Sequence, residues 1–375
     1  MMGDIERERQ MKAQCLQESL EHGLNIVKRA ASSRATLPVL EHILIQADDG
    51  RLRLSATNLE IGLTTTVGAR IEEPGGVSVP VRTLVDLVKA LPRERVDLEV
   101  DEKTATLALA CGTHKAHVKG MAEGAFPVIP THTDGYTELQ AANLVTAIKQ
   151  AAISAAGDEA RPILAGVLFK ASADGEIVLA AADGFRLSVN RVALGGVLEP
   201  FEVIIPVKAM RELAGLDPET AQVQVEKNRV IFDLDGTVLT SQLIDGRFPD
   251  YNQIIPNSHT TRTVLPAAQF GQALRTAAIF ARDASDIVKL DVRADAVQLS
   301  ARSAETGDGT VTVPATVEGE PIEIAFNITY LLHFLAVVDT PNVVLETTTA
   351  SSPGVLRPEG DSGFTYVIMP MHLGK

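Results

Sequence analysis

The sequence is poor in the residues that mark several common protein classes. It has two cysteines, Cys15 and Cys111, no tryptophan, and aromatic residues at only 4% of its 375 positions. Two distant cysteines outside any Cys-x-x-Cys spacing predict neither a disulfide framework nor a zinc site. The shortage of aromatic side chains argues against a platform on which the bases of single-stranded nucleic acid stack.

Long apolar runs and an apolar signal core are also missing. No run of about 18 apolar residues could span a membrane, and the N-terminus MMGDIERERQMK is polar and charged. We therefore expect a cytosolic protein. Lys and Arg number 34 against 48 Asp and Glu, which gives a net charge of −14. Because nucleic-acid-binding proteins are usually basic, the distribution of charge matters here more than its sum.

The stretch VIFDLDGTVLTS, residues 230–241, resembles the nucleophile motif of haloacid-dehalogenase-type phosphatases. In that interpretation Asp233 attacks phosphorus, Asp235 acts as acid and base, and Mg²⁺ bridges them. Such a nucleophile needs a parallel strand that leads into a helix, and no strand–helix alternation follows. An Asp-Gly pair between apolar residues instead favours a β-hairpin. We therefore interpret both aspartates as turn and surface carboxylates.

Three segments of similar pattern recur at a spacing of roughly 125 residues. Each opens with a helical apolar stripe, starting near Leu20, Leu144 and Phe270, and continues with alternating strands, a second helix and another strand pair. The pattern predicts an α+β protein of three similar domains, each with two helices packed on an antiparallel sheet. We place the domains at residues 11–134, 135–259 and 260–375. Residues 1–10 are expected to form a disordered N-terminal extension.

Charge is unevenly distributed between the predicted elements. Lys and Arg recur in the helical segments, whereas many Asp and Glu lie in strands and turns. If the helices share one face, that face could enclose a polyanion, because phosphate contacts supply affinity without reading base identity. The alternative is that the helices carry ordinary solvated charge.

Several motifs together resemble the bacterial DNA polymerase III beta subunit family, the sliding clamps. They are RATLPVLEHILIQA, SATNLEIGL, VPVRTLVDLVKALP, RPILAGVLF, AADGFRLSV, LIDGRFPDYNQIIP, IEIAFNITYLLHFL and YVIMPMHL. The resemblance covers about residues 11–373. It implies the DNA clamp fold and a head-to-tail homodimer that forms a ring around double-stranded DNA, with helices lining the hole.

The resemblance also implies what the ring does. It catalyses no reaction and needs no cofactor or metal. A clamp loader complex opens it, and it tethers the DNA polymerase III alpha subunit to the template without regard to DNA sequence. Other polymerases and repair proteins are expected to bind through a short peptide similar to Gln-Leu-x-Leu-Phe.

Site residues are carried over position by position from the family motifs. A peptide-binding pocket between the second and third domains would comprise Leu164, Gly184, Phe185, Arg186, Leu187, Pro249, Gln253, Ile254, Tyr330, Val367, Met369, Pro370 and Met371. The DNA-facing positions would be Arg34, Arg82, Lys89, Arg161 and Lys208. The dimer contact would involve Lys115, Ile279, Phe280 and Glu305.

Three departures from the family pattern bear on the peptide pocket. Ala182 and Phe185 stand where many relatives carry a hydroxyl and a His, which makes the rim more apolar. Gln253 and His372 stand where some relatives place Arg, which removes charge from the pocket edge. Two other functions stay open from the sequence: the Mg²⁺-dependent phosphatase, and a repeat scaffold that binds protein but no DNA.

Overall fold

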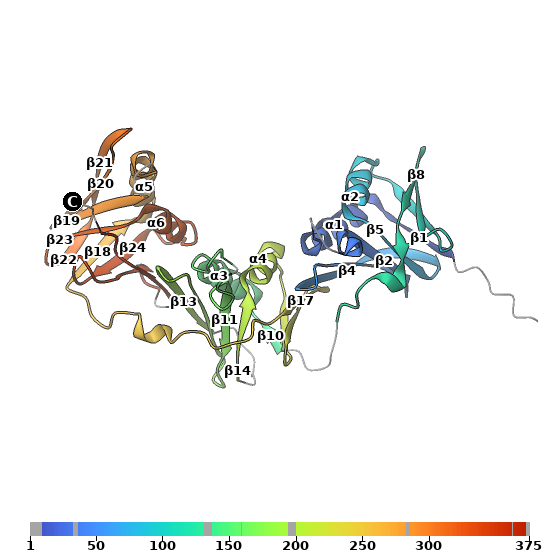
Figure 1. Cartoon of the computed structure of the whole chain (residues 1–375), viewed down its shortest axis with the longest axis horizontal. Helices are drawn as coiled ribbons and strands as arrows, with labels where there is room; N and C mark the ends of the chain where they lie inside the picture. The colour runs from blue at the N-terminus through green and yellow to red at the C-terminus, as the bar shows by residue number, and fades with distance from the viewer. Residues whose placement is uncertain are drawn as a thin grey trace, which may run out of the picture. The chain divides into compact units, whose positions relative to one another are not determined.

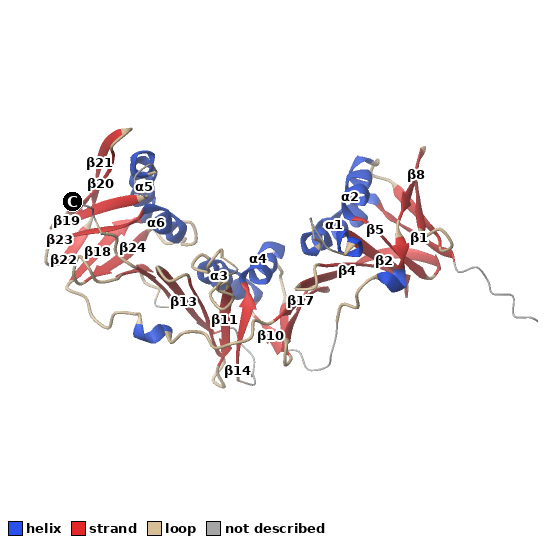
Figure 2. Cartoon of the chain, viewed as in Figure 1, coloured by secondary structure: helices blue, strands red, loops and turns tan. Residues whose placement is uncertain are grey.

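The computed structural model describes residues 10–32, 37–130, 137–158, 160–193, 200–282, 286–361 and 363–372. The chain divides into two compact units, one of residues 1–139 with 215–242 and the other of residues 140–214 with 243–375. Within each unit, helices cover antiparallel sheets (Figures 1 and 2). Most of the predicted N-terminal extension lies outside the described residues, and Gln10 begins the first strand.

Helices form where the apolar periodicity predicts them. They are α1 (Gln17–Val27), α2 (Val81–Ala90), α3 (Ala141–Ala152), α4 (Val207–Leu216), α5 (Ala267–Ala281) and α6 (Ile328–Leu335). In α1 the stripe of Leu20, Leu24 and Val27 is fully buried. Burial of such a stripe supplies most of a short helix's stability, because helices of this length are marginal alone.

Two helix starts have clear local causes. Pro80 closes β5 and stands as the N-cap of α2. Asn327 caps α6, since its side-chain oxygen accepts a hydrogen bond from the Tyr330 N–H at 3.2 Å. That bond satisfies one of the N–H groups left without a partner at a helix start.

The first unit contains one extended sheet. Its main path runs β10-β15-β16-β17-β4-β1-β6-β7-β8, and β2, β3, β5 and β9 branch from it. The strands are β1 (Gln10–Leu16), β2 (His42–Asp48), β3 (Arg51–Thr57), β4 (Ile61–Glu73), β5 (Gly75–Pro80), β6 (Arg95–Asp101), β7 (Thr106–Cys111), β8 (His114–Lys119), β9 (Met121–Ala122), β10 (Thr137–Leu139), β15 (Ala221–Val225), β16 (Arg229–Leu234) and β17 (Thr237–Gln242).

The second unit contains two sheets. One runs β14-β11-β12-β13-β26-β25-β24-β18-β22, and the other runs β21-β20-β19-β23. The strands are β11 (Gly166–Ala171), β12 (Glu176–Ala182), β13 (Arg186–Ala193), β14 (Phe201–Pro206), β18 (Thr261–Pro266), β19 (Ile287–Val292), β20 (Ala296–Ser303), β21 (Gly307–Pro314), β22 (Thr316–Gly319), β23 (Ile322–Asn327), β24 (Asn342–Thr347), β25 (Gly354–Pro358) and β26 (Phe364–Ile368).

Each repeat begins with a strand that the sequence pattern does not predict. A strand precedes the first helix of every repeat, as β1, β10 and β18 do, and four strands lie between the helices of the first repeat. In β1 the alternate residues Met11, Ala13 and Cys15 are buried. This period-two signal was present, but it is short and adjoins a stronger helical pattern.

The two cysteines and the helices bear on the predictions that the chain has no disulfide framework and no membrane span. Cys15 and Cys111 are free and buried, so no disulfide joins them. Burial, together with the charge of Asp97, raises the pKa of Cys15 to about 12, which makes its thiol unreactive. In the described part of the chain, no helix combines the length and apolar character needed to cross a membrane.

Candidate functional site

The DLDGT motif forms an antiparallel β-hairpin. β16 pairs with β17, and the turn residues Asp235 and Gly236 have φ of 53° and 79°. Two positive φ values are typical of the tight hairpin turn that favours Asp-Gly. The hairpin prediction is confirmed, and the phosphatase interpretation is wrong, because its nucleophile would have to end a parallel strand.

Both motif carboxylates are occupied by local hydrogen bonds. Asp233 Oδ1 accepts from the Gly236 N–H at 2.9 Å. Asp235 Oδ1 accepts from the backbone N–H and the hydroxyl of Thr220 at 2.8 and 2.6 Å, and its Oδ2 accepts from the Glu219 N–H at 2.7 Å. Burial opposes ionisation of Asp235, but these hydrogen bonds outweigh it and lower its pKa. Asp235 therefore ties the hairpin to the loop before β15.

The predicted peptide-binding residues gather where β13 and β26 pair. Leu187 lies opposite Val367, and the Met369 N–H donates to the Phe185 carbonyl at 2.9 Å. Phe185 and Met369, which are far apart in sequence, are thereby held together at one end of the strand pair. The Met371 N–H donates to the Ala325 carbonyl at 2.8 Å and anchors the segment that follows Pro370.

Asp183 shapes the loop that carries Gly184 and Phe185. Its Oδ1 accepts from the N–H groups of Phe185 and Arg186 at 2.9 and 3.0 Å. Gly184 has a φ of 97°, a conformation that residues with a Cβ rarely adopt. Asp183 was not predicted as a site residue, although an Asp before Gly at the end of a strand is a known turn signal.

Arg186 is a structural tie within this site. Its Nε lies 2.9 Å from Asp183 Oδ2, with side chains only 9% and 12% exposed. Its guanidinium carbon lies 4.2 Å from the centre of the Tyr330 ring, and its Nη1 lies 2.8 Å from His333 Nδ1. The Tyr366 hydroxyl donates to the Tyr330 carbonyl at 3.1 Å. Arg186 and Tyr330 thus join the β12–β13 loop to α6.

The charge of Arg186 affects its neighbours. Burial lowers the pKa of His333, and the positive charges of Arg186 and Arg211 lower it further. Burial raises the pKa of Tyr366. His333 and Tyr366 were not predicted as site residues, because only their contacts in the folded chain connect them with Arg186.

A segment around the 3-10 helix Tyr251–Gln253 covers the same sheet. Phe248 and Tyr251 are buried in one apolar cluster with Leu187 and Val367, and Leu164 packs against it. Pro249, Gln253 and Ile254 lie on the outer side of this segment and are exposed. Gln253 Nε2 donates to Asp250 Oδ2 at 2.9 Å, so its amide is held by its own segment.

The predicted set therefore separates into an exposed part and a buried part. Phe185, Ile254 and Met369 are 58%, 40% and 39% exposed, unusually high for large apolar side chains, whereas Leu187 and Val367 are each 1% exposed. We call the exposed trio with this floor the peptide surface. Phe185 and Met369, joined by a backbone hydrogen bond, leave apolar surface in water at one place, which marks a binding surface more often than a structural need.

Of the predicted DNA-facing residues, some lie on helices and one lies in a loop. Arg34 lies outside the described residues. Arg82 and Lys89 are exposed on α2, and Lys208 is exposed on α4. Arg161 lies in the loop before β11, where its Nη1 donates to the Asp183 carbonyl at 2.9 Å. It therefore belongs to the loop of the peptide surface and not to a helix face.

Basic residues are more frequent than acidic ones on the helices, but the separation of charge between helices and sheets is incomplete. In the part of the chain that the structure describes, the α-helices carry four acidic residues, Glu18, Glu21, Asp86 and Glu212, and six basic ones, Arg82, Lys89, Lys149, Lys208, Arg211 and Arg275. The helices are thus slightly basic in a chain whose net charge is −14.

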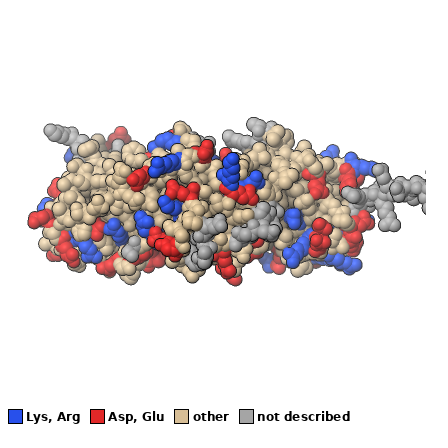
Figure 3. All heavy atoms as spheres, turned by 90° about the horizontal axis from the view of Figure 1, so that it is seen from below, with Lys and Arg blue, Asp and Glu red and all other residues tan. Residues whose placement is uncertain are grey.

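The sheets carry charges of both signs, which corrects the expectation of an acidic sheet side. Cross-strand ion pairs join Lys170 to Glu202 at 2.8 Å and Lys289 to Glu323 at 3.1 Å. Figure 3 shows Lys and Arg side chains among Asp and Glu on the face that it presents. The pairs are exposed and contribute little to stability.

The predicted dimer residues lie at two sheet ends. Lys115 is on β8, the last strand of its sheet, and Glu305 lies in the turn that leads into β21, the last strand of another. Ile279 of α5 is 62% exposed, whereas Phe280 packs against the core and contacts Gly309 of β21. An edge strand presents unpaired N–H and C=O groups, which makes it a template for another chain.

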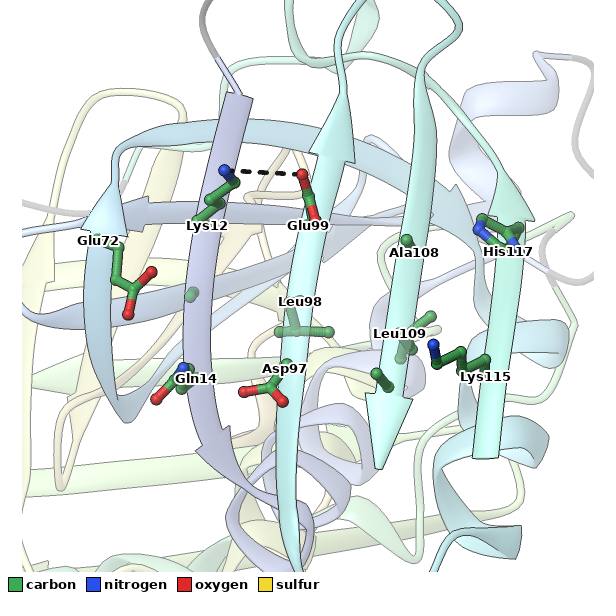
Figure 4. A pocket seen from close by; sticks show the side chains of 12 residues that line it. Lys12, Gln14, Glu72, Asp97, Leu98, Glu99, Ala108, Leu109, Lys115 and His117 are labelled. Atoms are coloured by element: carbon green, nitrogen blue, oxygen red, sulfur yellow. Dashed lines mark ion pairs between the residues drawn. The ribbon is translucent and has the colours of Figure 1, made fainter. Parts of the chain in front are cut away.

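A hollow of about 300 Å³ lies on the outer face of the sheet beside β8. Figure 4 shows Lys115 and His117 on β8 at one side of this hollow and Lys12 at the other, where Lys12 pairs with Glu99 at 3.8 Å. Ala108 lies between them on β7. The surface next to the edge strand is therefore polar and charged.

Comparison with known proteins identifies the family. Family models of the DNA polymerase III beta subunit match residues 11–130 (N-terminal domain), 138–250 (central domain) and 252–372 (C-terminal domain). The beta sliding clamp of Synechococcus elongatus is 31% identical over 375 residues, covering 97% of this chain and all of that relative. The clamp of Staphylococcus aureus is 30% identical, covering 93% of this chain and 96% of that relative.

Solved structures show the same fold over nearly the whole chain. The DNA polymerase sliding clamp of Bacillus subtilis superimposes with a TM-score of 0.92 at 26% identity, covering 97% of this chain and all of that one. The DNA polymerase III beta subunit of Thermotoga maritima gives 0.90 at 26% identity with the same coverage. These matches confirm the predicted α+β clamp fold of three similar domains. The chain belongs to the DNA polymerase III beta subunit family, the beta sliding clamps.

Proposed function

We propose that this chain is a sliding clamp, which encircles double-stranded DNA and tethers a replicative polymerase without catalysing a reaction. The observation that carries the proposal is the match of three consecutive beta-subunit domains, which together cover residues 11–372 almost without a gap. The proposed domains are residues 11–134, 135–259 and 260–375, with residues 1–10 as an extension.

Ring closure is proposed through the two edge strands. The β8 edge of one copy would meet the β21 edge of a second copy, which brings Lys115 and Glu305 of opposite charge into the same contact. β8 also carries His114, His117 and Lys119, whereas Asp308 lies on β21. Exposed Ile279 would supply the apolar centre of the seam, because burial of an aliphatic side chain contributes about 1.5–3 kcal/mol.

DNA contact is proposed for the cations of the helices, namely Arg82, Lys89 and Lys208, and for Arg34. Such contacts neutralise phosphates and release counterions, so affinity falls steeply with salt and carries no base preference. Arg161 is exposed and is proposed as a further DNA contact, with one guanidinium nitrogen held by the Asp183 carbonyl.

Partner binding is proposed at the peptide surface. An extended peptide similar to Gln-Leu-x-Leu-Phe would place its apolar side chains on Phe185, Ile254 and Met369, over the floor of Leu187 and Val367. Adaptable Met side chains suit several related ligands. We propose that a clamp loader complex, the DNA polymerase III alpha subunit and other polymerases or repair proteins use this surface in turn.

Topological binding separates a ring from an ordinary DNA-binding or protein-binding scaffold. The protein is loaded by a clamp loader on nicked circular DNA, isolated with the circle, and the DNA is then linearised. A clamp is retained on the circle and released from the linear DNA. Retention on both forms, or on neither, contradicts the proposal.

A further inference from the structure

The loop geometry of the peptide surface occurs a second time, in the first unit. In the β3–β4 loop, Asn58 Oδ1 accepts from the N–H groups of the second and third residues after it at 3.0 and 2.8 Å. Asp183 makes the same pair of bonds in the β12–β13 loop at 2.9 and 3.0 Å. The residues that follow, Leu59 and Gly184, both have positive φ, at 77° and 97°.

An added strand completes both loops in the same way. β17 pairs with β4 as β26 pairs with β13, in antiparallel register. The Gln242 N–H donates to the Glu60 carbonyl at 2.9 Å, as the Met369 N–H donates to the Phe185 carbonyl at 2.9 Å. The first unit therefore contains a structural counterpart of the peptide surface, built from a different part of the chain.

The segments that cover the two sheets also correspond, but a glycine replaces a leucine on the sheet beneath the first of them. Phe126 and Pro127 precede the counterpart segment as Phe248 and Pro249 precede the segment over the peptide surface. Gly62 stands at the position of Leu187, and Ile129 fills the room beside it, with Cγ2 2.7 Å from where a Gly62 Cβ would lie.

The space left open is a hollow of about 320 Å³ beside this segment, of the size that holds a side chain of a bound peptide. Val128 at its rim is 93% exposed, the highest value among the exposed large apolar residues of the described chain. Its lining includes Gln46, Arg53, Glu123, Phe126, Val128 and Ile129.

The hollow is lined by one cation, Arg53, and one anion, Glu123, which do not pair with each other in the described structure. Gln46 lies opposite Arg53 in the β2–β3 register. The Gln46 amide donates to Glu123 Oε1 at 2.5 Å, and the Glu123 carboxylate lies over Gly76 of β5, on the far side of Gln46 from Arg53. Within the described residues no acidic group pairs with Arg53, so its guanidinium is available to a carboxylate from outside.

We propose that this hollow is a second docking site, for an extended peptide that places an apolar side chain on Phe126, Val128 and Ile129 and a carboxylate on Arg53. The site goes beyond the proposed function, in which each chain holds one peptide. Among the described residues that line this hollow, Val128 is the only large exposed apolar side chain, against three at the peptide surface, so we expect the affinity of the second site to be about tenfold weaker. A partner with two such segments would gain from holding both sites of one chain.

Calorimetry with the full chain and the peptide acetyl-Gln-Leu-Asp-Leu-Phe tests the proposal. The expected result is two peptides per chain, a tighter and a weaker one. Val128→Asp and Arg53→Glu each remove the weaker event and leave the tighter one, and Met369→Asp does the reverse. Val128 and Arg53 are exposed, so neither substitution threatens folding. Lys227→Glu, an exposed charge reversal elsewhere in the same unit, serves as the matched control and leaves both events.

The outcomes separate this inference from the proposed function. One peptide per chain, lost in Met369→Asp, overturns the second site and leaves the sliding-clamp proposal intact. A weaker event that survives both Val128→Asp and Arg53→Glu also overturns it. No binding at all contradicts the peptide surface and the second site together.

Discussion

Arg186 and Asp183 form an ion pair at 2.9 Å that is almost closed to solvent, within a site proposed to bind ligands. The same guanidinium lies over Tyr330 and against His333. A buried pair is costly to break from one side, because the remaining charge loses its partner without regaining water. The shape of the peptide surface therefore depends on an interaction beneath it.

Arg186→Ala should lower the free energy of unfolding by about 3 kcal/mol, because Asp183 is left buried without its partner. Arg186→Lys keeps the charge but loses the planar fork, and should cost about half as much. Urea denaturation of the two variants measures both effects. If Arg186→Ala lowers the free energy of unfolding by less than about 0.5 kcal/mol, the pair behaves as a solvent-exposed ion pair and the prediction is wrong.

Deleting residues 371–375 should abolish capture of a Gln-Leu-x-Leu-Phe peptide at the peptide surface, because the Met371 N–H bond to Ala325 holds the Met369 segment in place. Dimer formation should be unchanged. Calorimetry measures the first and sedimentation the second, and an unaltered affinity for the tighter peptide refutes the site.

Ile279→Ala should weaken the dimer at least tenfold, since burial of an aliphatic side chain contributes about 1.5–3 kcal/mol and about 1.4 kcal/mol corresponds to a factor of ten. Its neighbour provides a contrast, because Phe280 packs against the core. Phe280→Ala should lower stability by about 3 kcal/mol and also weaken the dimer. Sedimentation and thermal melting distinguish the two; a dimer indifferent to both changes places the seam elsewhere.

Acidification should destabilise the protein through His42. Burial lowers the pKa of this imidazole, which is 9% exposed, below its ordinary value of 6.5. The unfolded chain therefore binds the proton first, so His42 leaves stability intact above pH 6.5 and lowers it as the pH falls below that value. Urea midpoints at pH 7.5 and 5.5 should differ less in His42→Gln than in the wild type. Exposed His372→Gln is the control and should behave as the wild type does.

The DLDGT aspartates should be structural and catalytically silent. Asp235→Asn should cost about 1 kcal/mol, because the hydrogen bonds from Glu219 and Thr220 lose their charged acceptor. With Mg²⁺ present, the wild type and Asp233→Asn should hydrolyse p-nitrophenyl phosphate no faster than buffer alone. Turnover that depends on Asp233 would reinstate a phosphatase.

Local patterns predicted much of this fold. The stripe of Leu20, Leu24 and Val27 predicted α1, and the Asp-Gly pair predicted the β16–β17 hairpin, because both signals lie within a few neighbouring residues. Long-range pairings were not predictable in this way: nothing local in β4 indicates that Thr237–Gln242 will extend its sheet. The site residues came from family resemblance, and the ties of Arg186 to Tyr330 and of Arg161 to Asp183 arise only when distant segments meet.

The pairing of β17 with β4 also bears on how the chain can be divided. A recombinant fragment ending at residue 134 would carry β4 without the strand that bonds to it, from Ile61 to Thr64. The unpaired N–H and C=O groups of β4 can pair with another copy of the fragment, so such a fragment is expected to aggregate. The first repeat of the sequence ends at residue 134, but its sheet is complete only with β17, which lies in the second repeat.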